Sequence, residues 1–446
     1  IEFMLALSVN ALLYIVTTII LFIRKRHSLI SFLWLLYSLF AIMGVIVVDT
    51  GIYDVFGKTS NYNFRFTPYI LNYVALILTT FPLRRFSFGA LNIKEIRFSK
   101  KFENIFNILF FFFIILIVAR LFEIRLYGNL DVGERHEQII AGGESLLTKE
   151  SHPILWLINV TIGRLYIVTY PLVIIYVFYR LTNKTRYWKT ISIFILCLMP
   201  DFLECYVSGN RSSLFFLVIN LFFFIILFYK YIKKTYIRKT IFFLLLAGIP
   251  FFVVVKGISV ARFEDTELGV SGSVFRYFGE AFPNLDFQYW KHVKSFTMGG
   301  RDFPSIYSII APEKVKQFSG FNERFDFWSY YTGVSTANFK TLFGDLYIEF
   351  GTYGALIFVF VLSLLMEIYI KKQSKLRMSN IMIIYVYFCY CTNAILNFPM
   401  LYFGSSWLKN YVAIFLLMLL LKYFEKKKLI RYEKCNCCSC DSQSIK

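Results

Sequence analysis

Two pairs of carboxylates are spaced so that each pair shares one face of a helix inside an apolar stretch of the chain. Asp201 and Glu204 are three residues apart, and Asp345 and Glu349 are four residues apart. Arg211 opens the apolar stretch that follows the first pair. Arginine holds phosphate oxygens in a planar fork, and a partly buried carboxylate can remove a proton from a hydroxyl group. These residue types therefore suit group transfer from a phosphorylated donor to a hydroxyl acceptor.

Long apolar segments must position these residues. The chain is 57% apolar, has 52 Phe among 446 residues and has a mean hydropathy of +0.59, which is typical of a polytopic membrane protein. Runs of about 17 to 25 apolar residues can cross a bilayer as helices. The sequence predicts an all-α fold with eleven such helices, at 3–23, 29–48, 67–82, 104–122, 154–178, 190–208, 212–228, 241–258, 342–370, 380–398 and 408–422.

The charge pattern predicts how these helices are oriented. The net charge is +20, and Lys and Arg concentrate in alternate connecting segments, which by the positive-inside rule face the cytoplasm. These segments are 24–27, 83–103, 179–189, 229–240, 371–379 and the tail after 422. Because the positive charges are scattered over short loops beside apolar spans, nucleic-acid binding is excluded as their explanation.

This orientation divides the chain into four parts. Residues 1–256 hold helices one to eight with a smaller outer loop at 123–153, and residues 257–341 form a large outer loop. Residues 342–422 hold helices nine to eleven, and residues 423–446 form a cytoplasmic basic and Cys-rich tail. The crowded tail cysteines, Cys435 to Cys440, fit a lipidated or unstructured end better than a four-thiolate metal site.

Charged residues from separate helices then share the depth of the outer leaflet. Ionisable groups in a bilayer are costly unless they are paired or wetted, so each is a candidate functional residue. A shared water-filled cavity that opens outward would explain the set, whereas snorkelling or a structural ion pair would explain any one member. The set comprises Arg120, Asp201, Glu204, Arg211, Lys256, Asp345 and Glu349, with Arg164 nearer to mid-membrane.

The large outer loop interleaves aromatic rings with charged side chains. An aromatic face stacks on the apolar face of a sugar ring, and polar side chains bond its hydroxyls, so a carbohydrate ligand is one interpretation. The alternative is that the rings form the loop's own core or lie at the membrane interface. The candidate binding residues of this loop are Arg262, Arg276, Glu280, Asp286, Trp290 and Arg301.

The sequence predicts neither a metal nor a cofactor. The four His are scattered, and no HExxH motif or acidic metal triad is present. The outer pair Asp49 and Asp54 is a weak alternative, because it is similar to the acidic loops of metal-dependent lipid-sugar transferases.

Three short segments carry a resemblance to a known family. Ser208-Gly209-Asn210-Arg211, a turn from the outer face into an apolar helix, resembles the Gly-Ser-Arg type turn of Wzy-type O-antigen and capsule repeat-unit polymerases. Glu349-Phe350-Gly351-Thr352-Tyr353-Gly354 is similar to the Glu-x-Gly-x-x-Gly helix that follows the large loop in that family. The segment Tyr277–Asn284 resembles loop sequences of such polymerases. The chain lacks the loop pattern of an Arg followed eleven residues later by Gly that occurs in some members.

The resemblance implies a GT-C-like membrane glycosyltransferase in the bacterial inner membrane, with its site facing the periplasm. Such an enzyme moves a growing glycan from undecaprenyl diphosphate onto the non-reducing sugar of a second lipid-linked repeat unit, which builds O-antigen (the polymer of lipopolysaccharide) or capsular polysaccharide. A flippase and a chain-length regulator are the partners of such enzymes.

On this reading Arg211, with Arg262 or Arg276, would hold the diphosphate. Glu280, Asp345 or Glu349 would be the base that activates the acceptor hydroxyl. The remaining substrate-binding candidates are Arg120, Arg164, Asp201, Glu204, Asp286, Trp290 and Arg301.

Two other functions fit parts of the pattern. An O-antigen ligase would use the same donor with a lipid acceptor, and the sequence separates it poorly from a polymerase. A transporter of lipid-linked sugars would show repeated halves and charges at every depth, and the sequence shows neither feature.

Overall fold

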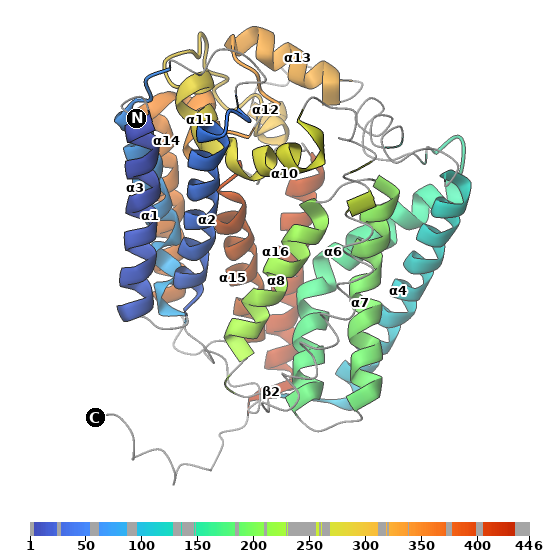
Figure 1. The fold of residues 1–446 in the computed structure, drawn as a ribbon. Coiled ribbons are helices and arrows are strands. Elements are labelled where there is room, and N and C mark those ends of the chain that lie inside the picture. The colour runs from blue at the N-terminus through green and yellow to red at the C-terminus, as the bar shows by residue number, and fades with distance from the viewer. Residues whose placement is uncertain are drawn as a thin grey trace.

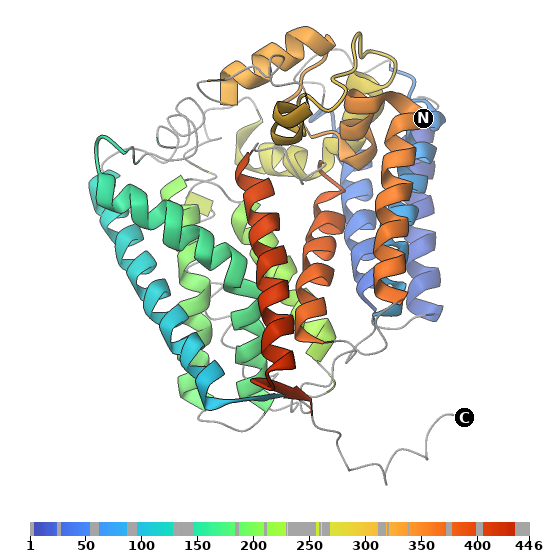
Figure 2. The same ribbon diagram turned by 180° about the vertical axis from the view of Figure 1, so that it is seen from behind.

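The computed structural model shows a bundle of long helices with short helices across one end (Figures 1 and 2). It describes residues 4–24, 28–53, 62–86, 96–127, 149–182, 187–208, 212–228, 268–310, 321–337, 339–371, 377–397 and 405–432, together with residues 135, 147, 230, 256, 257, 260 and 318. The long helices are α1 (Leu5–Arg24), α2 (Leu29–Asp49), α3 (Phe66–Thr80), α4 (Lys100–Tyr127), α6 (Pro153–Thr182), α7 (Tyr187–Ser208), α8 (Ser212–Phe228), α14 (Thr341–Lys371), α15 (Met378–Asn393) and α16 (Ser405–Lys426).

Short elements connect these helices at the two ends of the bundle. A 3₁₀ turn, η3 (Phe81–Arg85), extends α3, and two short strands, β1 (Ile96–Phe98) and β2 (Ile430–Tyr432), pair antiparallel. The other short elements are α10 (Gly269–Gly279), α11 (Ala281–Asn284), η6 (Leu285–Tyr289), α12 (Pro304–Ile310) and α13 (Phe321–Thr332).

The fold is that of an all-α polytopic membrane protein. Within the described residues, seven helices are long and apolar enough to cross a membrane: Leu5–Arg24, Leu29–Asp49, Phe66–Arg85, Lys100–Tyr127, Pro153–Thr182, Trp188–Ser208 and Thr341–Lys371. Ten of the eleven predicted apolar runs coincide with a helix. The run at 241–258 lies outside the described residues except for 256 and 257, so the count of eleven spans stays a prediction.

The helices form two groups that stand side by side in Figure 1. Helices α1, α2, α3 and α14 make one group, and α4, α6 and α7 make the other, with α8, α15 and α16 between them. The hydroxyl of Tyr387 on α15 donates a hydrogen bond to the backbone carbonyl of Thr79 on α3 at 2.7 Å. Tyr37 on α2 donates in the same way to the carbonyl of Cys391. Buried tyrosines therefore join α15 to the first group.

The two ends of the bundle differ in charge. Helices α10 to α13 lie across one end, called the outer end here after the predicted orientation, and the β1–β2 pair lies at the opposite, inner end. At the inner end the carboxylate of Glu367 accepts from Arg84 at 2.9 Å and Arg85 at 3.1 Å, with the Lys371 ammonium at 3.8 Å. The described parts of the predicted basic and outer segments thus lie at opposite ends, and the assignment of the inner end to the cytoplasm stays a prediction.

Helix α14 bends at Gly351, where the sequence predicted one continuous span. Gly351 has φ of 69° and ψ of −173°, a backbone conformation that side chains with a Cβ rarely adopt. The bend leaves the carbonyls of Ile348 and Glu349 without their helical partners, and they accept hydrogen bonds from the backbone N–H groups of Thr297 and Met298. The outer half of α14 is therefore a separate buried helix, tied to the segment that carries Arg301.

Candidate functional site

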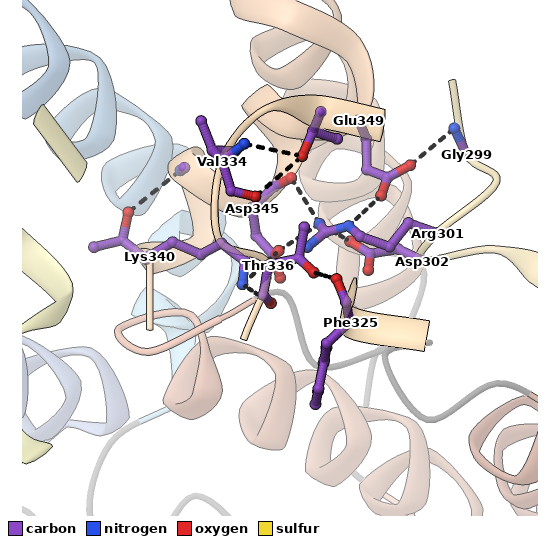
Figure 3. A network of polar contacts seen from close by, with 12 residues as sticks. Gly299, Arg301, Asp302, Phe325, Val334, Thr336, Lys340, Asp345 and Glu349 are labelled. Atoms are coloured by element: carbon purple, nitrogen blue, oxygen red, sulfur yellow. Dashed lines mark hydrogen bonds and ion pairs between the residues drawn. The ribbon is translucent and has the colours of Figure 1, made fainter. Parts of the chain in front are cut away.

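A buried ionic cluster surrounds Arg301 at the outer end (Figure 3). The Arg301 guanidinium donates to Glu349 Oε1 at 2.8 Å, to Asp345 Oδ1 at 2.5 Å and to Asp302 Oδ2 at 2.9 Å. The second oxygen of Glu349 accepts from the backbone N–H of Gly299 at 2.8 Å. The Lys340 ammonium lies 3.8 Å from Asp345 and donates to the Thr336 carbonyl at 2.8 Å. The structure thus brings together three predicted site residues, Arg301, Asp345 and Glu349.

Burial dominates the electrostatics of the Arg301 cluster. The side chain of Arg301 is 2% exposed, and those of its three carboxylates are 0% exposed. Burial by itself lowers the pKa of the Arg301 guanidinium. The three neighbouring carboxylates have the larger combined effect and raise this pKa above its ordinary value. Burial also raises the pKa of Asp302 and lowers the pKa of Lys340 to about 8. A proton held by Asp302 would balance the cluster at two positive and two negative charges.

A second ion pair lies on α10 and is less enclosed. The Arg276 Nε donates to the carboxylate of Glu280 at 2.9 Å, and the two side chains are 19% and 11% exposed. Gly279 lets α10 sit against α2, because a Cβ there would lie 2.6 Å from the carbonyl oxygen of Met43. Burial raises the pKa of Glu280, with Arg276 and Lys340 acting in the opposite direction. The raised pKa makes Glu280 a better general base than an ordinary exposed carboxylate.

A third ion pair fixes the start of α3 to η6. The Asp286 carboxylate accepts from the Arg65 Nε at 2.8 Å and from the Arg65 backbone N–H at 2.6 Å. The Asp286 side chain is 0% exposed, whereas that of Arg65 is 36% exposed. Arg65 was not among the predicted site residues, although its place before the third apolar run, on the predicted outer side, was a usable signal. Because Asp286 is bonded to Arg65, we give Asp286 a structural role and assign it no contact with a substrate.

Amide groups lie between these two ion pairs. The Asn284 amide accepts from the hydroxyl of Tyr53 and from the Gln288 amide at 2.9 Å, and it donates to the Phe339 carbonyl at 2.8 Å. Trp290 is 7% exposed, and its ring lies 5.2 Å from that of Tyr347 on α14. Trp290 is thus part of the packed core of the outer end, as the alternative reading of the loop aromatics predicted.

The remaining predicted site residues lie in the other helix group. Arg120 on α4 donates to Glu123 at 2.7 Å and pairs with Glu204 on α7. Asp201 lies one turn before Glu204, and Arg164 is partly buried on α6. These helices stand on the opposite side of the molecule from α14 (Figures 1 and 2). The outer-level charges therefore gather in two places, where the sequence had predicted one shared cavity.

Some predicted residues lack a structural account. Arg211, Arg262 and Asp54 lie outside the described residues, and Lys256 is exposed. Within the described ranges, no group of three or more His, Cys, Asp and Glu is placed to hold a metal ion.

Comparison with protein families, curated proteins and solved structures gives no match to this chain.

Proposed function

We propose that this protein is a membrane glycosyltransferase that joins polyprenyl-diphosphate-linked oligosaccharide units at its outer end. The observation that carries the proposal is the half-open Arg276–Glu280 pair, whose side chains are 19% and 11% exposed. It lies on the segment that resembles polymerase loops, next to the hydrogen-bonded amides of Asn284 and Gln288. A guanidinium, a carboxylate of raised pKa and amide groups are what transfer from a diphosphate to a sugar hydroxyl requires.

The proposed step gives each group one role. The Glu280 carboxylate accepts the proton of the acceptor hydroxyl, and the hydroxyl oxygen forms a bond to the anomeric carbon of the donor. The bond from that carbon to the diphosphate oxygen breaks, and the lipid diphosphate leaves with the electron pair. Arg276, with Arg211 and Arg262 as predicted partners, stabilises the negative charge on the leaving group.

Burial distinguishes Glu280 from the other two predicted bases. The side chains of Asp345 and Glu349 are 0% exposed, and both carboxylates form ion pairs with Arg301. A group enclosed in this way cannot reach a sugar hydroxyl unless the cluster opens. We therefore assign Asp345 and Glu349 to holding the outer half of α14, and Glu280 to the chemistry.

A chain-length assay in the source cells tests the proposal. Cells in which the native copy is replaced by Glu280→Gln should carry single repeat units on the surface acceptor and no long chains. Asp326→Asn is the matched control, because Asp326 is an exposed carboxylate of α13 at the same end. Membrane levels of both variants are measured by immunoblot.

The pattern of loss separates the two enzyme classes. A ligase variant would remove all surface glycan, single units included, whereas a polymerase variant retains single units. Long chains at the normal level in cells with well-inserted Glu280→Gln would contradict the assignment of Glu280.

A further inference from the structure

Asn284 is a buried amide at the end of α11 whose acceptor oxygen is fully used inside the protein. It is 1% exposed. Its Oδ1 accepts hydrogen bonds from the Tyr53 hydroxyl and from the Gln288 amide at 2.9 Å, which uses both acceptor sites of an amide oxygen. Its Nδ2 donates to the carbonyl of Phe339 at 2.8 Å. An enclosed amide with these partners acts on its neighbours and does not contact a ligand.

The backbone of Phe339 connects Asn284 to Glu280. The Phe339 carbonyl accepts from Asn284, and the Phe339 backbone N–H donates to the carboxylate of Glu280. The N–H of Lys340, in the same peptide unit as the Phe339 carbonyl, donates to the carbonyl of Leu396 at 3.0 Å. Two hydrogen bonds therefore fix this peptide unit, and its position sets where the Phe339 N–H points.

The Phe339 N–H and the Arg276 Nε both donate to the Glu280 carboxylate, the latter at 2.9 Å. Burial raises the pKa of Glu280, and the two donors lower it, because a hydrogen bond to a carboxylate favours its charged form. Among the described residues, the other titratable groups that face Glu280 are Tyr53, which follows α2, and Lys340, which precedes α14. A general base must be ionised and held in one direction, and the Phe339 N–H contributes to both.

We propose that Asn284 is a positioning residue for Glu280, acting through the backbone of Phe339. The amide holds the Phe339 carbonyl, so that the Phe339 N–H stays directed at the Glu280 carboxylate. Tyr53 and Gln288 hold the amide in turn, which ties the end of α2 and η6 to the site. The importance of Asn284 for sugar transfer rests on the proposed function, whereas its effect on the Glu280 carboxylate does not.

Titration of the Glu280 carboxyl group in the purified full-length protein tests the positioning role. Infrared spectra of protein labelled with carbon-13 glutamate are recorded across pH, and the Glu280 signal is the difference between each protein and its Glu280→Gln counterpart. Asn284→Leu fills the space of the amide but cannot donate to Phe339. We expect it to raise the midpoint of the titration by about one pH unit, a roughly tenfold change in proton affinity, because a hydrogen bond to a charged group is loosened.

Two further variants complete the test. Asn284→Ser leaves a smaller neutral side chain and should also raise the midpoint, which keeps the test valid if Asn284→Leu does not fold. Asn380→Leu is the matched control, because Asn380 is a buried amide near the start of α15, at the inner end, that accepts from Tyr369 at 3.1 Å. It should leave the midpoint unchanged. An unchanged midpoint in folded Asn284 variants, or an equal rise in Asn380→Leu, would overturn the proposal.

Transfer rates of the same proteins separate this inference from the proposed function. If wild type transfers sugar, the pH at which the rate falls on the acid side should rise in Asn284→Leu together with the infrared midpoint, because the base must be ionised. A rate profile that stays in place despite a raised midpoint would overturn the catalytic part of the role. If wild type transfers no sugar at any pH, the proposed function fails, and a raised midpoint still supports the positioning of Glu280 by Asn284.

Discussion

Two of the arginine–carboxylate sites at the outer end, around Arg301 and on α10, use the same residue types in opposite ways. Around Arg301, three carboxylates and a lysine pair with one another inside the protein at an exposure of 2% or less, although the Arg301 Nη1 and the Asp302 Oδ1 have no hydrogen-bond partner among the described residues. On α10, Arg276 and Glu280 form one ion pair and are more exposed than the Arg301 cluster, at 19% and 11% of their side chains. An enclosed cluster is suited to holding its elements together, whereas a half-open pair is better placed to contact a ligand. The burial of an arginine–carboxylate site, more than its residue types, therefore indicates whether its role is structural or chemical.

Removing the centre of the enclosed Arg301 cluster should have the largest effect on stability. Arg301→Leu leaves three buried carboxylates without their cation, which typically costs about 3–5 kcal/mol. We expect little folded protein and a strongly lowered unfolding midpoint in detergent. Arg276→Leu is the comparison variant, and it should lose much less stability because its partner Glu280 is less enclosed, at 11% of its side chain, than the carboxylates around Arg301. Equal stability losses in the two variants would remove the distinction between the sites.

The bend in α14 should be the next most sensitive feature. Gly351→Ala forces a Cβ into a conformation with φ of 69°, about 3.3 Å from the Phe296 ring. The backbone strain alone costs roughly 1–3 kcal/mol, so the unfolding midpoint should fall. Gly163→Ala is the matched control, because a Cβ at Gly163 on α6 meets nothing within 4 Å. That variant should be neutral or slightly stabilised. A Gly351→Ala protein as stable as wild type would argue against a rigid bend.

The smallest expected effect is a pH dependence that originates at Asp302. Burial raises the folded pKa of Asp302 above its ordinary value of 3.8. Its bound proton therefore stabilises the fold fully below about pH 3.8, and this stabilisation is lost as the pH rises through the folded pKa. Unfolding midpoints of wild type and Asp302→Asn, measured across pH, should diverge in slope, with the wild type falling more as the pH rises. Parallel curves would mean that Asp302 is ionised in the folded protein.

Apolar run length and charge alternation predicted most of the helices and the two ends of the bundle. Run length predicted the helices because the bilayer fixes helix length. The asymmetry of Lys and Arg predicted which described segments share an end, and the side that each end faces stays a prediction. The bend at Gly351 could not be predicted from them, since Gly also occurs inside straight membrane helices and the bend depends on a pairing with Thr297 and Met298. Long-range contacts of this kind leave no periodic trace in a sequence.

The candidate site was predicted in part. The residue types and the outer depth led to Arg301, Asp345 and Glu349, which do meet. Their enclosure was not predictable, because it depends on how residues 297–302 fold over α14. The prediction also merged Arg120 and Glu204 with this group, since depth along a membrane says nothing about which helices are neighbours.

The most direct test compares Glu280→Gln with Asp345→Asn in purified protein. Initial rates of transfer between lipid-diphosphate oligosaccharides are measured together with unfolding midpoints. The account predicts that Glu280→Gln keeps its midpoint and loses at least about 100-fold in rate, the usual contribution of a general base. Asp345→Asn should instead lower the midpoint, with any folded fraction still active. A stable, fully active Glu280→Gln protein, or a stable and inactive Asp345→Asn protein, would contradict the assignment of chemistry to the half-open pair.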